Sequence, residues 1–431
     1  MTKPAGRPNW FKLDNAAKIY PPSATRRWQS MFRVSVTLDE DVDPALLQIA
    51  HERTLHRLPS FAVRLRKGLF WYYLEYAEGT PPLVEDTQNP CQTINPRENR
   101  GFLYRLLYWR GRIALEFFHV LADGTGGMTF LMTLANEYLR LVHGEDAAPA
   151  KYILSCDDEP RPGEYEDAFP RYAGKAANSP SDTGAYHPRG RAVPLNRLLL
   201  TMGTVPTDAL AAKAREHGVT VGVFLSSLLV WAVHEHQLAE RSRRRRKQPV
   251  KICVPINLRR FFPSETVRNF SAFVNIGIDA RLGTHSFEEI LTQIKHQMGM
   301  LVNEKTLGAW LTYNVKAERN LFVRIVPLFV KRLILKAVFT MQGDRYSSIT
   351  CSNLGRVDLP EPMAGHVQRV DFCLGRSVKR RTNACVVSFG GQTFIDFSRN
   401  LREADIERRF FAELVRLGVP VTVESNGTIG R

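Results

Sequence analysis

The feature that most constrains this chain is an alternating, strand-like run that ends in a histidine loop. Residues 113–118 (IALEFF) have the pattern of a strand, and residues 119–124 (HVLADG) follow directly. Residues 125–127 (TGG) lead into residues 128–142, whose apolar positions form one face of a helix. A histidine at a strand end, with an acid four residues later and glycines beside it, is typical of a general base in a tight loop. This arrangement predicts proton removal from a hydroxyl or amine that attacks a thioester.

The three polar positions of this loop have different expected roles. His119 would be the base, because an imidazole with an ordinary pKa of about 6.5 can both accept and return a proton near neutral pH. A histidine at a strand end can also be purely structural, but the flanking strand, glycine pair and helix favour catalysis. Asp123 could orient the imidazole, although its spacing favours a carboxylate that points away and anchors the loop to an arginine. Gly124 would allow a tight turn or a positive φ.

The length of the chain favours two domains of ordinary size. Residues 145–195 are rich in Asp, Glu, Pro, Gly and Ser, which is typical of a connecting segment. So long a loop inside one compact domain would be unusual. We therefore expect an N-terminal unit over residues 1–185, which includes most of the linker-like segment, and a C-terminal unit over residues 186–431.

The sequence patterns of both units indicate a mixed α/β structure. Helices are expected at 43–54, 128–142, 206–217, 220–240, 286–303 and 403–417. Strands are expected at 28–38, 61–65, 69–76, 104–109, 112–118, 195–202, 251–258, 272–280, 347–353, 367–372, 384–389 and 393–398.

Several classes of protein are disfavoured by the composition. No run approaches eighteen uncharged apolar residues, and the first fifteen residues lack the apolar core of a secretory signal. Six scattered cysteines without a CxxC pair suit free thiols better than disulfides or a zinc site. Cys351 and Cys385 lie in strand patterns and are expected to be buried, inert thiols. The expectation is a cytoplasmic protein without a metal.

The net charge of +16 is partly concentrated in residues 241–247 (RSRRRRK). This run can be a solvated loop, or it can attract an anionic partner such as a phosphate-bearing acyl donor, an acidic carrier protein or a membrane surface. No recognised nucleic-acid motif accompanies it, so we expect no nucleic-acid partner.

The loop and several later segments resemble one acyltransferase superfamily. HVLADG resembles the HxxxDG motif of the chloramphenicol-acetyltransferase-like superfamily, which includes alcohol acetyltransferases, BAHD acyltransferases, wax ester synthases and condensation domains. Residues 255–260 (PINLRR), with 268–270 (RNF) and 273–275 (FVN), resemble a second conserved segment of the superfamily. Residues 371–375 (DFCLG) are similar to the BAHD motif DFGWG. The likeness is strongest to bacterial alcohol acetyltransferase-like proteins.

The resemblance implies two similar subdomains, each a mixed sheet flanked by helices, with a tunnel between them. His119 would face the middle of the tunnel, with the acyl thioester entering from one mouth and the nucleophile from the other. Asp123 would form a structural salt bridge with Arg259, or with Arg260 as the second choice. Because neighbouring side chains of a strand face opposite ways, only one of these arginines can serve.

The chain also departs from the superfamily pattern. Phe118 stands where many members carry a first histidine, HHxxxDG. That histidine is not the base in the family scheme, so its loss does not argue against activity. Residues 371–375 lack the tryptophan and the first glycine of DFGWG, which weakens the likeness to the BAHD subgroup and not to the superfamily.

Four further polar residues are candidates for binding an oxyanion or lining the tunnel. Ser352 and Asn353 lie in a segment (SNLG) that resembles the border of the acyl tunnel, although they can instead form a turn before Gly355. Asn269 and Asn275 belong to the second conserved segment. An oxyanion needs donors aimed at the developing negative charge.

Residues 321–339 (LFVRIVPLFVKRLILKAVF) are apolar with interspersed cations and an internal proline. They can form a buried helix pair that is broken at Pro327. Alternatively, they form an interfacial helix that touches lipid or captures an apolar substrate. Peripheral membrane contact is therefore one expectation.

Together these features predict a monomeric acyltransferase. It would move an acetyl or fatty acyl group from a coenzyme A or carrier-protein thioester to an alcohol or amine, with acyl-CoA as a co-substrate and no permanently bound cofactor. A stand-alone condensation-like domain is the first alternative, although no carrier or adenylation segment adjoins it here. The second is a catalytically silent binding protein of the same fold.

Overall fold

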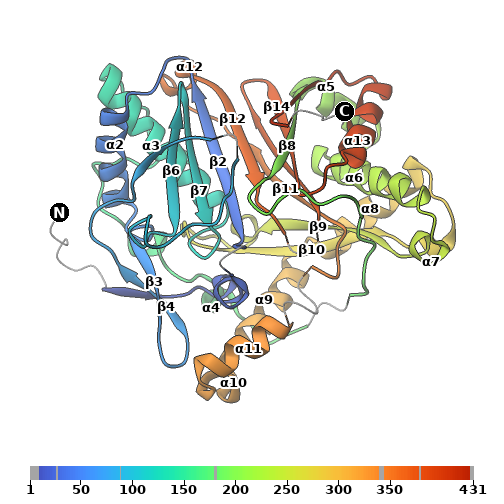
Figure 1. Ribbon diagram of the computed structural model, residues 1–431, viewed down its shortest axis with the longest axis horizontal. Helices are drawn as coiled ribbons and strands as arrows, with labels where there is room; N and C mark the ends of the chain where they lie inside the picture. Colours follow the sequence, from blue (N-terminus) through green and yellow to red (C-terminus); the bar gives the residue numbers. More distant parts are fainter. Residues whose placement is uncertain are drawn as a thin grey trace.

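The computed structural model describes residues 9–25, 28–87, 89–178, 182–338, 344–377 and 380–427 of the chain. These residues form two large mixed sheets flanked by helices, together with a small third sheet. Figure 1 shows the five-stranded sheet on the left, mostly in blue, and the seven-stranded sheet on the right. The mixed α/β class predicted from the sequence is confirmed.

The five-stranded sheet is built mainly from the first third of the chain. Its strands are β2 (Met31–Leu38), β5 (Leu83–Glu85), β6 (Tyr104–Trp109), β7 (Arg112–Phe118) and β12 (Val367–Leu374). The helices that cover it are α2 (Pro44–Arg57) and α3 (Gly124–His143). The strand order is β12-β2-β7-β6-β5, and all neighbours are antiparallel except β5 and β6. Helices α2 and α3 pack on each other, and α3 packs on β2 and β7.

The seven-stranded sheet is formed entirely by strands that follow residue 198. Its strands are β8 (Leu199–Pro206), β9 (Val250–Asn257), β10 (Ser271–Ile278), β11 (Ile349–Arg356), β13 (Thr382–Phe389), β14 (Gln392–Arg399) and β15 (Thr422–Ser425). Its helices are α5 (Thr207–Glu216), α6 (Val221–Leu238), α7 (Arg243–Arg246), α8 (Phe287–Leu301) and α13 (Asp405–Arg416). The order is β10-β9-β11-β13-β14-β8-β15, with β11 parallel to both of its neighbours.

Most of the remaining elements lie in the lower part of the molecule in Figure 1, whereas α12 lies at its top. The small sheet has the order β1-β4-β3 and is formed by β1 (Trp10–Lys12), β3 (Val63–Lys67) and β4 (Tyr72–Tyr76). The short helices are η1 (Ala16–Ile19), α1 (Tyr20–Ser23), η2 (Pro162–Glu164), α4 (Phe169–Tyr172), η3 (Leu258–Arg260), η4 (Ala280–Leu282) and α12 (Met363–His366). Three further helices are α9 (Glu304–Arg319), α10 (Leu321–Ile325) and α11 (Leu328–Val338).

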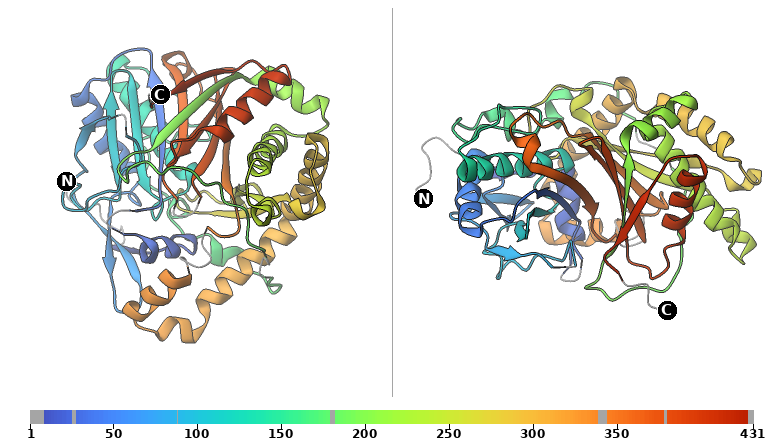
Figure 2. Two further views of the ribbon diagram at one scale, coloured as in Figure 1. Left: turned by 45° about the vertical axis from the view of Figure 1, so that its right-hand side comes forward. Right: turned by 90° about the horizontal axis from the view of Figure 1, so that it is seen from above.

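Strand β12 connects the two halves of the molecule. It lies late in the chain, yet it pairs antiparallel with β2, so that Val370 is opposite Val36. It also contacts β13 and β14 of the seven-stranded sheet. Figure 2 shows this strand in orange beside the blue strands. A strand expected at 367–372 is therefore present, but it completes the sheet of the first half. The division at residues 185 and 186 stays a prediction.

An aromatic cluster fixes the end of β7 on which the histidine loop depends. The rings of Phe61, Tyr104, Phe117 and Phe130 are all buried, and the Phe61–Phe130 centroids lie 4.8 Å apart. Burying one such ring stabilises the fold by roughly 1.5–3 kcal/mol. Because the rings come from β6, β7, α3 and the segment before β3, they hold β7 and α3 in a fixed relation. The loop between β7 and α3 is therefore held at both ends.

The linker-like segment, residues 145–195, has little regular secondary structure but packs against the rest of the protein. Glu164 forms a buried ion pair with Arg57 of α2, and Tyr186 is fully buried. In the described part of the segment, the helical turns are η2 and α4. The expected long connection is thus present, and it packs along the molecule.

The apolar segment at 321–339 forms two helices, α10 and α11, which break at Val326 and Pro327. Residue 339 lies outside the described residues. The expectation of a buried pair is wrong, because Leu321, Phe329 and Leu333 are largely exposed. Among the described residues, no single helix is long and apolar enough to cross a membrane. Helices α5 and α6 meet that criterion only as a pair, which is bent by 81°.

Candidate functional site

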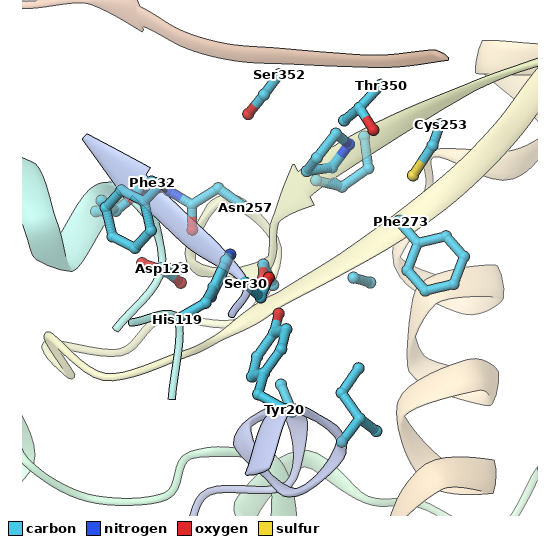
Figure 3. Close-up of a pocket in the computed structure, with 18 of the residues that line it drawn as sticks. Tyr20, Ser30, Phe32, His119, Asp123, Cys253, Asn257, Phe273, Thr350 and Ser352 are labelled. Carbon is cyan, nitrogen blue, oxygen red and sulfur yellow. Dashed lines mark hydrogen bonds between the residues drawn. The ribbon is translucent and has the colours of Figure 1, made fainter. Parts of the chain in front are cut away.

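His119 is the first residue after β7, and its ring lies between aromatic neighbours. Its backbone N–H donates to the carbonyl oxygen of Ser30 at 2.9 Å. The imidazole stacks on Tyr20 with 4.7 Å between centroids, and Phe32 meets it edge-on at 5.2 Å. Figure 3 shows the ring beside these residues and facing a pocket. The contacts restrict the ring to one orientation.

Asn269 determines which nitrogen of the ring carries the proton. The side-chain amide of Asn269 donates to Asp14 Oδ2 at 3.3 Å, so its oxygen Oδ1 faces the histidine. His119 Nδ1 lies 3.0 Å from that oxygen. Because Oδ1 can only accept, Nδ1 is the protonated nitrogen. The neutral ring therefore keeps Nε2 free of a proton, as a general base requires.

Burial lowers the pKa of His119 below its ordinary value of 6.5. The nearby Asp123 carboxylate and the hydrogen bond with Asn269 oppose this effect by favouring the imidazolium, but desolvation is larger. The ring is consequently neutral at physiological pH. A neutral imidazole with an unprotonated Nε2 can accept a proton from an incoming hydroxyl or amine.

Asp123 is directed away from the ring and into the protein. Its Oδ1 accepts from the N–H of Gly126 and caps helix α3. Its Oδ2 accepts from Arg259 Nη1 and from the N–H of Phe270, both at 2.8 Å. The pairing of Asp123 with Arg259 is therefore present, while Arg260 is exposed. This geometry excludes a direct triad, because the carboxylate holds the loop to the segment after β9.

The glycines of the loop are required for space. Gly124 does not adopt a positive φ, so of the two alternatives expected for it, a tight turn or a positive φ, the second is wrong. A Cβ on Gly124 would lie 2.7 Å from the side chain of Leu354, whereas one on Gly126 would lie 1.8 Å from the backbone oxygen of Val267. Because the backbone of Val267 cannot move aside for a Cβ atom, the absence of a side chain at Gly126 allows α3 to lie close to the segment that carries Asn269.

A large cavity of about 2800 Å³ contains His119. The start of β2 and the loop after β7 line one side of it, and β9, β10 and β11 line another. Figure 3 shows Ser352 and Thr350 across the pocket from Tyr20, with Phe273 and Cys253 to one side. The cavity therefore lies between the two large sheets, where the resemblance implies a tunnel. The two separate mouths stay a prediction.

Three of the other four candidate residues, Ser352, Asn353 and Asn275, line this cavity. Ser352 is buried in β11 and lines the cavity. Asn353 is exposed, and its side chain accepts from the N–H of Gly355, which has a φ of +77°. Asn275 donates to Asp182 Oδ2 at 2.7 Å. The turn interpretation thus describes Asn353 better, and Ser352 remains the candidate donor to an oxyanion.

Sequence reasoning missed two residues of this site. Asp14 and Tyr20 precede β2 and belong to no motif, yet they fix Asn269 and stack on His119. No local signal could have found them, because their partners are far away along the chain. Asn269 was expected at the oxyanion or tunnel wall, whereas its side chain holds the histidine.

Two cysteines, Cys253 and Cys351, line the cavity. All six cysteines are free, and Cys351 and Cys385 are buried as expected. Burial raises the pKa of Cys351 to about 12, which leaves it a poor nucleophile. Across the described ranges, no group of three or more His, Cys, Asp or Glu side chains is placed to hold a metal ion.

No family model matches the chain. Two proteins of Mycobacterium tuberculosis, MT2362 of strain CDC 1551 and Rv2305 of strain H37Rv, are each 24% identical over 354 residues. The match covers 76% of this chain and 78% of each relative, and both are described as uncharacterized.

Solved structures show a clear similarity in fold. Polyketide synthase associated protein 5 of Mycobacterium tuberculosis superimposes with a TM-score of 0.63 at 17% identity, covering 95% of this chain and 98% of that one. TRI101 of F. sporotrichioides, complexed with coenzyme A and T-2, gives 0.62 at 12%, with 97% and 100% covered. A variant starter condensation domain of rhizomide synthetase RzmA with C8-CoA gives 0.57 at 14%, with 95% of both chains covered.

The chain therefore has the two-subdomain fold of the chloramphenicol-acetyltransferase-like superfamily, which the sequence motifs had indicated. The neighbours that share this fold include the trichothecene 15-O-acetyltransferase TRI3, TRI101 in complex with coenzyme A, and condensation domains.

Proposed function

We propose that this protein is an acyltransferase that moves an acyl group from a thioester donor to a hydroxyl or amine, with His119 as the general base. The observation that carries the proposal is the state of the imidazole. Its Nδ1 is bonded to Asn269, its pKa is lowered by burial, and its ring borders a cavity between two sheets. The similarity to CoA-dependent acyltransferases supports the same reaction class.

The proposed reaction proceeds without a covalent acyl-enzyme. His119 Nε2 takes the proton from the acceptor O–H or N–H while the acceptor atom attacks the thioester carbonyl carbon. The carbonyl oxygen becomes an oxyanion, to which the Ser352 hydroxyl is the candidate donor. The intermediate then collapses, the C–S bond breaks, and the departing thiolate receives the proton from His119.

The size and charge of the cavity suit two substrates. Drug-sized ligands usually occupy about 300–1,000 Å³, so a cavity of about 2800 Å³ has room for a donor and an acceptor together. Cations that line it could pair with the phosphates of coenzyme A, among them Lys18, Arg260, Arg319 and Arg356. Coenzyme A is therefore the proposed donor carrier, and a carrier protein is the alternative.

The experiment that tests this function is mass spectrometry of the products formed from a panel of acyl-CoAs with alcohols and amines. We expect an acylated acceptor and free coenzyme A in equal amounts. Transfer only to amines, or only from a carrier-protein thioester, would favour a condensation-like reaction. Binding of acyl-CoA without any product across the panel would contradict the proposal and indicate a silent binding protein.

A further inference from the structure

An exposed apolar stripe runs along α10 and α11, at the lower end of the molecule in Figure 1. Leu321 and Ile325 are four residues apart on α10, Phe329 and Leu333 are four residues apart on α11, and each of these side chains is between 56% and 70% exposed. Side chains at this spacing lie on one face of a helix. Large apolar side chains in such a row are unusual on a surface that only meets water.

The opposite face of α11 is hydrogen-bonded to the turn between β3 and β4. Lys331 is buried, donates to the carbonyl oxygen of Phe70 at 2.9 Å, and lies 4.7 Å from the ring centre of Trp71. The N–H of Leu328 donates to the carbonyl oxygen of Leu69 at 2.9 Å. The stripe therefore faces outward because the other side of the helix is already occupied.

The turn between β3 and β4 extends the apolar stripe. Leu69 is 73% exposed and Phe70 is 46% exposed. The hydrogen bonds to α11 place this turn beside the helix, and Figure 2 shows the hairpin and the two helices side by side in the left view. We call the six side chains the docking patch: Leu69, Phe70, Leu321, Ile325, Phe329 and Leu333.

The helical segment of the docking patch carries charges of one sign. Residues 319–338 contain five cations and no acid. Arg324, Arg332 and Lys336 are exposed beside the stripe, whereas Lys331 is used internally. An apolar helix face flanked by arginine and lysine is the composition of a helix that lies in the interface of an anionic bilayer. A positive rim complements anionic headgroups, while the apolar row enters the boundary of the acyl chains.

We propose that the docking patch binds the surface of an anionic phospholipid membrane. Phe70, Arg324 and Leu335 also line the large cavity, so docking would bring the cavity next to the bilayer. The docking does not rest on the proposed acyl transfer. Only its consequence, that a lipid-borne substrate enters from this side, depends on that function.

The test is sedimentation of the full chain with lipid vesicles, without any acyl donor. We expect binding to vesicles of phosphatidylcholine mixed with phosphatidylglycerol, and much weaker binding to phosphatidylcholine alone. Leu333→Glu should lower the partition coefficient about tenfold or more, because a leucine inserted in the interface is replaced by an anion. Leu282→Glu is the matched control, since Leu282 is 80% exposed on η4 and lies outside the patch.

A second pair of variants tests the charges. Arg332→Gln with Lys336→Gln should weaken binding to the mixed vesicles by at least about fivefold. Arg243→Gln with Arg244→Gln removes two cations from the exposed run on α7 and should leave binding unchanged. All substituted side chains are exposed, so the melting temperatures should stay equal to that of the wild type.

Three results would overturn the proposal. The first is a wild-type protein that fails to sediment with the mixed vesicles. The second is binding that survives in Leu333→Glu or that is lost in the α7 variant instead. The third is concentration-dependent self-association that Leu333→Glu abolishes, because the patch would then be covered by a second copy of the chain.

Discussion

At the residue scale, the orientation of His119 depends on a chain of hydrogen bonds that runs through Asn269 to Asp14. Asp14 is fully buried, and burial raises its pKa. The nearby Arg268, whose Nη2 is 3.5 Å from Asp14 Oδ2, and the N–H of Ala17 both favour the carboxylate. The buried acid thus fixes the amide of Asn269, and the amide fixes the imidazole. Asn269 is a positioning residue in this scheme.

We predict that Asn269→Ala lowers kcat by about 10–100-fold, a part of the 10²–10⁴-fold that a general base supplies. The base works only when neutral, so kcat/KM should fall as pH drops through the pKa of His119, which lies below 6.5. The hydrogen bond with Asn269 raises that pKa, so its loss should move the acid limb to still lower pH. The pH profile of kcat/KM measures this shift.

A matched control for Asn269→Ala is Asn196→Ala, since Asn196 is exposed and outside the cavity. This variant should keep the wild-type kcat and pH profile. If Asn269→Ala lost activity only through a raised KM and kept its acid limb unchanged, Asn269 would not position the base.

At the element scale, Asp123 joins the start of α3 to the segment that follows β9. One carboxylate caps the helix, pairs with Arg259 and accepts from the N–H of Phe270. The side chains of Asp123 and Arg259 are only 7% and 11% exposed. Breaking a buried pair on one side leaves an uncompensated charge, which is strongly destabilising.

We predict that Asp123→Asn lowers the free energy of unfolding by about 3 kcal/mol. Urea denaturation measures this loss. Asp405→Asn is the control, because its pair with Arg408 is exposed and should contribute less than about 1 kcal/mol. Unchanged stability of Asp123→Asn together with lost donor binding would contradict a structural role for this carboxylate.

The bounds of helices and strands could be predicted from the sequence where neighbouring residues determine them. The hairpin of β6 and β7 has the expected bounds, 104–109 and 112–118, because alternating strands flank a short turn at Arg110 and Gly111. Ser286 caps α8 with Glu289, as the capping-box spacing indicates. The contact of Asn269 with His119 could not be read in the same way, because it joins residues 150 positions apart.

At the scale of the whole molecule, the two halves share structure through β12. This strand covers the free edge of β2 in the first half although it belongs to the last quarter of the chain. Its Phe372 packs within 6.4 Å of Phe32, which in turn contacts His119. No sequence pattern shows which sheet such a strand will join, because pairing with either sheet requires the same alternation.

We predict that a fragment of residues 1–185 does not fold cooperatively. Without β12, the β2 edge would be unpaired and apolar side chains of the first core would be exposed to water. Thermal unfolding followed by circular dichroism should show a broad transition for the fragment and a sharp one for the full chain. A sharp transition of the isolated fragment would show that β12 is dispensable for the first unit.

The central claim is that His119 removes the acceptor proton inside the cavity between the two sheets. The most direct measurement is acceptor-dependent release of free thiol from acyl-CoA by His119→Ala, beside the control His296→Ala, whose imidazole is exposed on α8. We predict that His119→Ala folds normally and loses about 10²–10⁴-fold in kcat, whereas His296→Ala keeps the wild-type rate. A folded His119→Ala protein that retained wild-type turnover would contradict the claim.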